Sequence, residues 1–122
     1  RPGELLDAGV NVTIGTGNYE DNWEGLGALD PLERARFAWH ALPLADRRGE
    51  GIDDAWRMVT TSARKATGRP PATLAVGAEA SFVVLSASDR LHALRNEPAT
   101  RHVVRRGALV AQRTVTTRLL YS

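Results

Sequence analysis

The chain has 122 residues, 43% of them hydrophobic and 25% charged, which is typical of a globular domain with a sizeable core. It contains no cysteine, so the sequence excludes disulfides and thiolate metal sites and favours a cytoplasmic protein. Its apolar runs are too short to cross a membrane, and its first residues lack the charged and then apolar pattern of a secretory leader.

The net charge of +2 raises the question of nucleic acid, because basic patches bind phosphate. The arginines and lysines are spread along the chain, and even the densest groups, Arg47-Arg48 and residues 101–106, are not interleaved with aromatic residues. Scattered basic residues are typical of a solvated surface. We therefore expect neither nucleic acid nor a membrane as a partner.

The first predicted elements are the end of a helix and a strand. Residues 4–8 form a last helical turn that Gly9 closes. Residues 10–14 are rich in β-branched side chains, and the Gly-Thr-Gly-Asn at residues 15–18 stops the pattern, which predicts a short buried strand that opens into a loop. Strand ends of this kind carry the chemistry of many α/β enzymes, so we interpret residues 19–27 as a site-like loop.

Two helices are predicted next. The sequence Asp-Pro-Leu-Glu at residues 30–33 combines a good N-cap, a proline suited to the first helical position and a capping-box glutamate. It predicts a helix that continues with an apolar face until Pro43. After a polar loop, a second helix is expected, which Asp53 or Asp54 can cap and whose single apolar stripe runs from Ala55 to Ala66.

The last part of the chain predicts a small antiparallel sheet. Short strands are expected at residues 82–85, 101–105 and 108–111, with Arg106-Gly107 as a turn and residues 114–120 as a fourth strand.

Several blocks together carry a resemblance to a known family. They are Leu-Leu-Asp-Ala-Gly-Val-Asn-Val-Thr-Ile-Gly-Thr at residues 5–16, Glu-Asp-Asn-Trp at 20–23, Asp-Pro-Leu-Glu at 30–33, and the later blocks 56–64, 74–85 and 103–111. In this order they resemble the cytosine-deaminase branch of the metal-dependent amidohydrolases.

The resemblance implies an α/β fold: a C-terminal fragment of a (β/α)8 amidohydrolase barrel plus strands of a small β-sandwich. Residues 1–73 would be the end of the barrel, with its last strand, site loop and two helices, and residues 74–122 the C-terminal strands of the sandwich. A whole barrel takes roughly 250 residues. The chain also begins at Arg1 and has its only methionine at Met58, so we expect a processed product or a part of something larger.

A divalent metal, zinc or iron, is implied only for a complete family member. The histidines that would hold it, a His-X-His pair and others on earlier strands, are expected upstream of this chain. His40, His92 and His102 match none of them. We place His40 in a helix and the other two in the sheet region, in structural or exposed roles, and expect no metal site in this chain alone.

The catalytic position that the chain covers departs from the family pattern. Gly17 stands where the family has an aspartate that touches the metal and shuttles a proton. Three interpretations stay open: a degenerate homologue, a single-base change or sequencing error, or a neighbouring side chain that serves instead. Asn18 offers an amide oxygen but cannot take up a proton, so we favour loss of function at this site.

Asn18 and Trp23 are the candidate substrate-binding residues. The family's matching tryptophan lies in an Asp-Pro-Trp turn that shapes the substrate pocket, and here the turn is Asp21-Asn22-Trp23. A loop tryptophan packed on the barrel rim is an equally good interpretation.

Two function classes follow. The first is the C-terminal portion of a metal-dependent hydrolase that acts on C–N bonds of a small heterocycle and is inactive as this isolated chain. The second is a non-catalytic pseudoenzyme or a packing module. Because a cut barrel leaves apolar faces uncovered, we also expect self-association.

Overall fold

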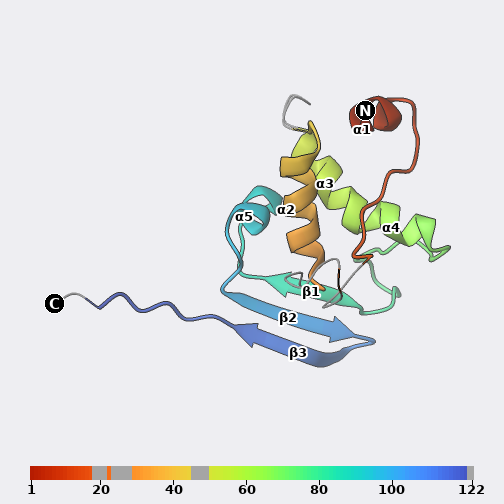
Figure 1. Cartoon of the computed structure of the whole chain (residues 1–122). Coiled ribbons are helices and arrows are strands. Elements are labelled where there is room, and N and C mark those ends of the chain that lie inside the picture. Colours follow the sequence, from red (N-terminus) through yellow and green to blue (C-terminus); the bar gives the residue numbers. More distant parts are fainter. Residues whose placement is uncertain (18–21, 23–28, 45–49, 121–122) are drawn as a thin grey trace. The chain divides into compact units, whose positions relative to one another are not determined.

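The computed structural model describes residues 1–17, 22, 29–44 and 50–120 (Figure 1). The chain divides into two compact units, Arg1–Ala72 and Thr73–Ser122. In the described residues, the first unit contains only helices as regular elements, and the second contains a three-stranded antiparallel sheet with one helix. The chain is therefore a small mixed α/β structure.

Helix α1 (Pro2–Asp7) ends as its sequence predicts. Gly9 has a φ of +78°, a conformation that costs glycine little. Its amide donates to the carbonyl of Leu6, and the amide of Val10 donates to that of Leu5, both at 2.9 Å. This pair of bonds is the glycine-closed helix end that satisfies the last free carbonyls.

The strand predicted for residues 10–14 is not formed, and that prediction is wrong for this structure. The β-branched side chains suit a strand, but a strand exists only by pairing with a neighbour. The described part of the first unit contains no other strand. The segment instead runs past the helices α3 and α4 that are described below (Figure 1).

Helix α2 (Pro31–Ala41) begins where the sequence predicts. A side-chain oxygen of Asp30 accepts the amide of Leu32 at 2.9 Å, and Pro31 occupies the first helical turn. The helix ends at Leu42, which is extended with φ −101° and ψ 147°. The next residue, Pro43, explains this ending because a proline disfavours helical geometry in the residue before it.

The second predicted helix is two helices, α3 (Gly51–Val59) and α4 (Thr61–Ala66). The break lies at Thr60, whose φ of −120° and ψ of −94° are not helical. The Thr60 hydroxyl donates to the carbonyl of Trp56 at 2.7 Å, a bond of the kind that bends helices. Capping by Asp53 or Asp54 was also wrong, since α3 already begins at Gly51.

The core of the first unit is built from small and flexible side chains. Its described buried apolar residues are Ala35, Ala38, Leu44, Ala55 and Met58. Alanines on α2 and α3 allow two helices to approach closely. Gly51 allows a further close contact, with the turn after α2, because a Cβ there would lie 2.7 Å from the carbonyl carbon of Leu44 and closer still to its oxygen.

Replacing Gly51→Ala should therefore lower the free energy of unfolding by about 1–3 kcal/mol, the usual cost of overpacking. Urea denaturation followed by circular dichroism would measure the loss. Gly15→Ala is the matched control, because a Cβ at Gly15 meets nothing within 4 Å. Equal stability of the two variants would contradict the close approach of Gly51 to Leu44.

The sheet of the second unit consists of β1 (Phe82–Leu85), β2 (Thr100–Arg105) and β3 (Ala108–Thr114), in the order β1-β2-β3. Both pairings are antiparallel, with an irregularity at Val103/Val104. The turn between β2 and β3 has φ of 50° at Arg106 and 81° at Gly107, as a two-residue hairpin of the mirror-image type requires. The three strands and this turn confirm the sequence prediction.

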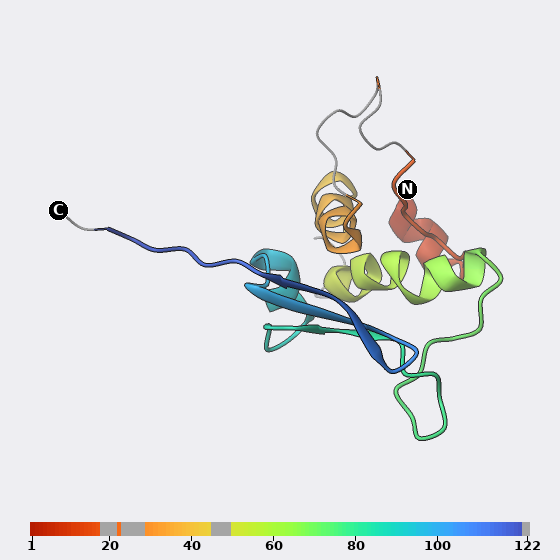
Figure 2. The same cartoon turned by 90° about the horizontal axis from the view of Figure 1, so that it is seen from below.

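Residues 115–120 do not form the predicted fourth strand. Strand β3 continues to Thr114, and the residues after it leave its end without folding back (Figures 1 and 2). An antiparallel return needs a turn, and residues 114–120 contain no glycine, proline, asparagine or aspartate. The β-branched side chains of residues 114–120 were therefore not sufficient to form a fourth strand.

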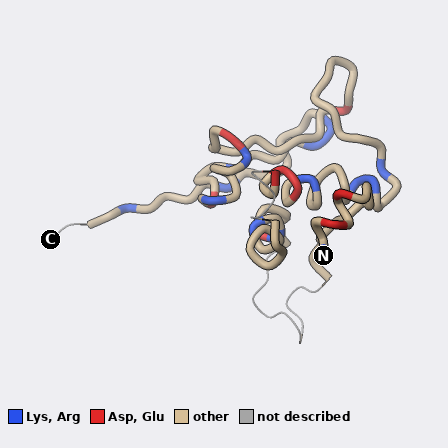
Figure 3. The backbone as a smooth tube through the Cα atoms, turned by 90° about the horizontal axis from the view of Figure 1, so that it is seen from above, with Lys and Arg blue, Asp and Glu red and all other residues tan. Residues whose placement is uncertain are grey.

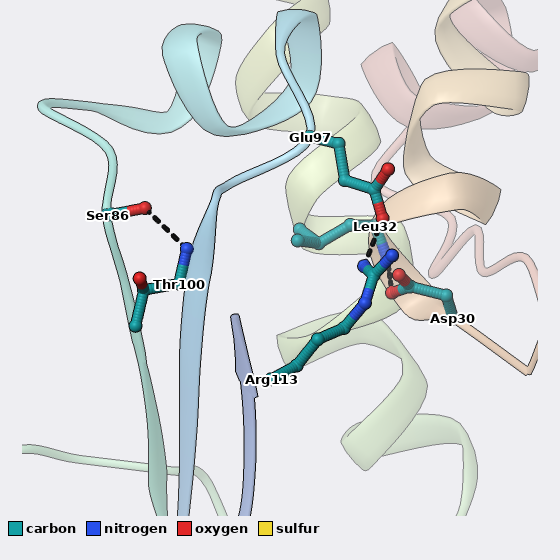
Figure 4. Close-up of polar contacts among 6 residues, drawn as sticks. All are labelled: Asp30, Leu32, Ser86, Glu97, Thr100 and Arg113. Carbon is teal, nitrogen blue, oxygen red and sulfur yellow. Dashed lines mark hydrogen bonds and ion pairs between the residues drawn. The ribbon is translucent and has the colours of Figure 1, made fainter. Parts of the chain in front are cut away.

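Helix α5 (Arg90–Arg95) was not predicted, and His92 lies on it rather than in the sheet. The local signal was Asp89, whose side chain accepts the amide of His92 at 2.7 Å. The loop that carries α5 is anchored where β1 and β2 meet, since the amide of Thr100 donates to the Ser86 hydroxyl at 2.9 Å (Figure 4). The same figure shows Glu97 paired with Arg113 of β3.

The Asp89 cap should make α5 sensitive to acid. The pKa of the Asp89 carboxyl is lowered, first because it accepts the His92 amide and second because the Ser88 hydroxyl donates to it. A lowered pKa means that the ionised cap favours the folded chain above the ordinary aspartate range, and that this contribution is lost as the pH falls through the lowered pKa.

A carbon-13 NMR titration should thus place the Asp89 midpoint below that of aspartate in an unstructured peptide. Ser88→Ala should move it upward, because the Ser88 donor is removed while the His92 amide remains. A midpoint at or above the peptide value in the unmodified chain would show that the cap is absent.

Candidate functional site

Three hydrogen bonds fix the segment that leads into the candidate site. The Thr13 hydroxyl and the Ile14 amide donate to the carbonyl of Met58, at 2.9 and 3.3 Å. The side-chain amide of Asn11 donates to the carbonyl of Ser62 at 3.1 Å. The acceptors lie on either side of the break at Thr60, so the broken helix is the support for this segment.

Gly17 lies three residues beyond this support and is exposed. A Cβ at Gly17 would meet nothing within 4 Å, and its φ does not lie in the left-handed region that favours glycine. The backbone therefore does not require a glycine here. A side chain such as aspartate fits the position, so nothing steric accounts for the glycine that we predict to stand in place of the family's aspartate.

The other two predicted site residues, Asn18 and Trp23, lie outside the described residues. Their predicted roles in binding substrate stay predictions.

A hollow of about 110 Å³ lies next to the site segment. Ligand pockets for small molecules are usually about 300–1,000 Å³, so this hollow alone is too small for a heterocyclic substrate. Its described lining residues come from the segment, the start of α2 and the end of α3, and they are Ile14, Gly15, Thr16, Leu29, Pro31, Arg34 and Val59.

Arg34 is the charged residue of that lining, and the sequence analysis did not single it out. It lies three residues after Pro31, which places both on the same side of α2. Its guanidinium offers fixed hydrogen-bond donors within the first turns of the helix. No sequence pattern distinguishes it from the other arginines of the chain.

The three histidines belong to three different elements. The ring of His40 on α2 meets Trp39 edge-on with centroids 5.0 Å apart. On α5, Nδ1 of His92 lies 3.3 Å from the Ser88 amide that donates to it, and His102 belongs to β2. Among the residues that the structure describes, no group of three or more histidine, aspartate or glutamate side chains could hold a metal ion.

Carboxylates with shifted pKa values often mark functional sites. Besides Asp89, Glu79 has such a shift, and its cause is structural. The pKa of Glu79 is lowered, first by the hydrogen bond from Ser81 and then by the charge of Arg106. The amide of Gly107 donates to the carbonyl of Ala80 at 2.9 Å. These contacts hold the turn of the β2–β3 hairpin in place. We therefore attribute the shifted pKa of Glu79 to the fold and not to a functional site.

Charges of both signs follow one another along each unit (Figure 3). In the first unit the buried Asp54 pairs with Arg57 one turn later, at 3.5 Å. In the described residues, no helix is long and apolar enough to cross a membrane.

No family model matches the chain, but comparison with known proteins finds relatives that it matches over part of their length. The chain is 35% identical over 108 residues to the pterin deaminase of Rhizobium rhizogenes (strain K84 / ATCC BAA-868), which is 88% of this chain and 24% of that protein. The chain is homologous to a part of the metal-dependent amidohydrolases. This confirms the resemblance seen in the sequence.

A second amidohydrolase agrees with the first. The chain is 26% identical over 110 residues to the N-isopropylammelide isopropyl amidohydrolase of Pseudomonas sp. (strain ADP), covering 89% of this chain and 27% of that protein. The chain thus spans about a quarter of the length of the curated amidohydrolases it matches, and both of its units fall within the similarity.

The metal content of the purified chain tests our expectation that this chain alone has no metal site. Because the described residues offer no metal-binding group and Gly17 has no carboxylate, we expect no stoichiometric zinc or iron. Elemental analysis after exhaustive dialysis would measure it. One equivalent of tightly held metal would contradict the prediction and direct attention to the segments around Asn18 and Trp23.

Proposed function

We propose that this chain is the C-terminal part of a hydrolase that acts on a C–N bond of a small heterocycle, in the manner of cytosine deaminase, and that it is inactive alone. The observation that carries the proposal is the relationship, over 88% of the chain, to a protein named a pterin deaminase. The second relative, which is named an amidohydrolase, supports the same class of reaction.

The division of the chain fits this proposal. The unit Arg1–Ala72 would contribute the last barrel strand at residues 10–14, the site loop and the helices α2 to α4. The unit Thr73–Ser122, with its antiparallel sheet, would contribute strands to a β-sandwich. In barrels of this kind the active site is built at the carboxyl ends of the strands, which is where Gly15 to Gly17 stand relative to residues 10–14.

The chemistry sets a requirement that position 17 does not meet. Metal-assisted hydrolysis of a C–N bond uses a metal-activated water and a carboxylate that moves its proton. The described residues of this chain do not fit a metal, so its ligands would have to come from other parts of the complete protein. Glycine has no group that exchanges a proton, and we assign Gly17 no step in the reaction.

The alternative function is a catalytically silent one, a pseudoenzyme or a packing module. Gly17 is the observation that favours it, because the open space around that position shows that a carboxylate would fit and is nevertheless absent. The two functions differ in what Gly17→Asp would restore.

Exposed apolar side chains support the view that the chain needs further cover. Those more than half exposed include Leu29 and Phe37 in the first unit and Leu74, Leu109, Val110 and Leu119 in the second. We propose that the rest of the parent polypeptide covers such residues, and that the isolated chain self-associates in its absence.

The test uses the complete parent protein with Gly17→Asp. We expect ammonia release from cytosine or pterin to rise by at least about 100-fold, since a positioned general acid/base contributes roughly 10²–10⁴ in rate. Gly17→Asn is the matched control, because it adds a side chain of the same size that cannot exchange a proton.

Gly15→Asp controls for position, since a side chain also fits there, and neither control should raise the rate. A parent protein that is fully active with Gly17, and that Gly17→Asp leaves unchanged, would show that the family's aspartate does not correspond to position 17.

A further inference from the structure

We infer that residues 10–14 have two mutually exclusive partners, and that their docked position on α3 and α4 must be released before they can serve as a barrel strand. The inference rests on the proposed function, because the barrel supplies the second partner. It goes beyond that function by giving Asn11 and Thr13 a role, which is to hold the segment against α3 and α4 before the barrel forms.

In the docked position, two side chains of the segment each donate to one backbone carbonyl of the helices. Asn11 and Thr13 are two residues apart, which spans about 6.6–6.8 Å in an extended chain and places both side chains on one side. Their acceptors, the carbonyls of Ser62 and Met58, lie on either side of the break at Thr60. Because the later residue of the segment meets the earlier residue of the helices, the segment runs antiparallel to α3 and α4.

The break at Thr60 makes the principal acceptor available. The last four carbonyls of a helix have no partner within it, and Met58 lies in the last turn of α3. Its carbonyl accepts both the Thr13 hydroxyl and the Ile14 amide. The segment thus supplies hydrogen bonds that an unbroken helix would form internally, which explains why it docks here.

The same groups are needed elsewhere in a barrel. Ile14 has a single backbone N–H, and in the docked chain it points to Met58 and not to a neighbouring strand. Side chains alternate along a strand between the barrel interior and the helices. If position 17 faces the interior site, positions 11 and 13 face it too, so Asn11 and Thr13 cannot keep their bonds to Ser62 and Met58.

Docking and strand pairing are consequently alternatives. Assembly with the rest of the barrel has to break two side-chain bonds and one backbone bond of the segment and turn its odd-numbered side chains away from the helices.

Amide hydrogen exchange measured by NMR tests this inference on the 122-residue chain. Thr13→Val keeps the β-branched shape and removes the hydroxyl, so exchange at Ile14 should accelerate roughly 2- to 10-fold, the effect of one net hydrogen bond. Thr13→Ser keeps the hydroxyl and should leave the rate unchanged. The amide of Gly107, which donates to Ala80 in the second unit, is the internal control and should not respond to either variant.

The same variants in the complete parent protein complete the test. There Ile14 should be protected equally with threonine, valine or serine at position 13, because a neighbouring strand holds its amide. Equal Ile14 exchange in the isolated chain and its Thr13→Val variant would overturn the docking. Acceleration by Thr13→Val in the parent as well would overturn the release. The proposed function fails separately, on the activity of the Gly17→Asp parent.

Discussion

The carbonyl of Met58 is the group on which the arrangement of the candidate site depends. It lies at the end of α3, just before the non-helical Thr60, and it accepts hydrogen bonds from both Thr13 and Ile14. The first unit contains no described strand to pair with residues 10–14, so these bonds replace a sheet ladder. They determine where Gly15 to Gly17 emerge and place the hollow near Val59 and Arg34.

Local signals in the sequence predicted most of the element ends. Gly9 closes α1, Asp30 and Pro31 begin α2, and Arg106-Gly107 forms the β2–β3 turn. Each of these depends on the backbone preference or the hydrogen bonds of a few adjacent residues, which is why a sequence shows them. Features that depend on distant partners were predicted less well. The clearest case is residues 10–14, where a strand was predicted and none forms.

Other differences have equally specific causes. The apolar stripe through residues 55–66 continues across Thr60, so the pattern did not show the break that the backbone makes there. The short α5 has too few residues for a helical period to appear, although Asp89 is a sound N-cap. The candidate site was located from its resemblance to the amidohydrolases, while the space around Gly17 and the proximity of Arg34 to the hollow required coordinates.

The proposed function requires this chain to be one part of a larger amidohydrolase. Its similarity to two such enzymes covers about nine-tenths of the chain and about a quarter of theirs, and its exposed apolar residues point the same way. The most direct measurement is the mass of the natural polypeptide that contains residues 1–122, determined by mass spectrometry after capture with an antibody against this chain. We expect a polypeptide roughly four times as long, because the chain covers 24% of its relative. A natural product of 13.2 kDa, the mass of this chain alone, would contradict it.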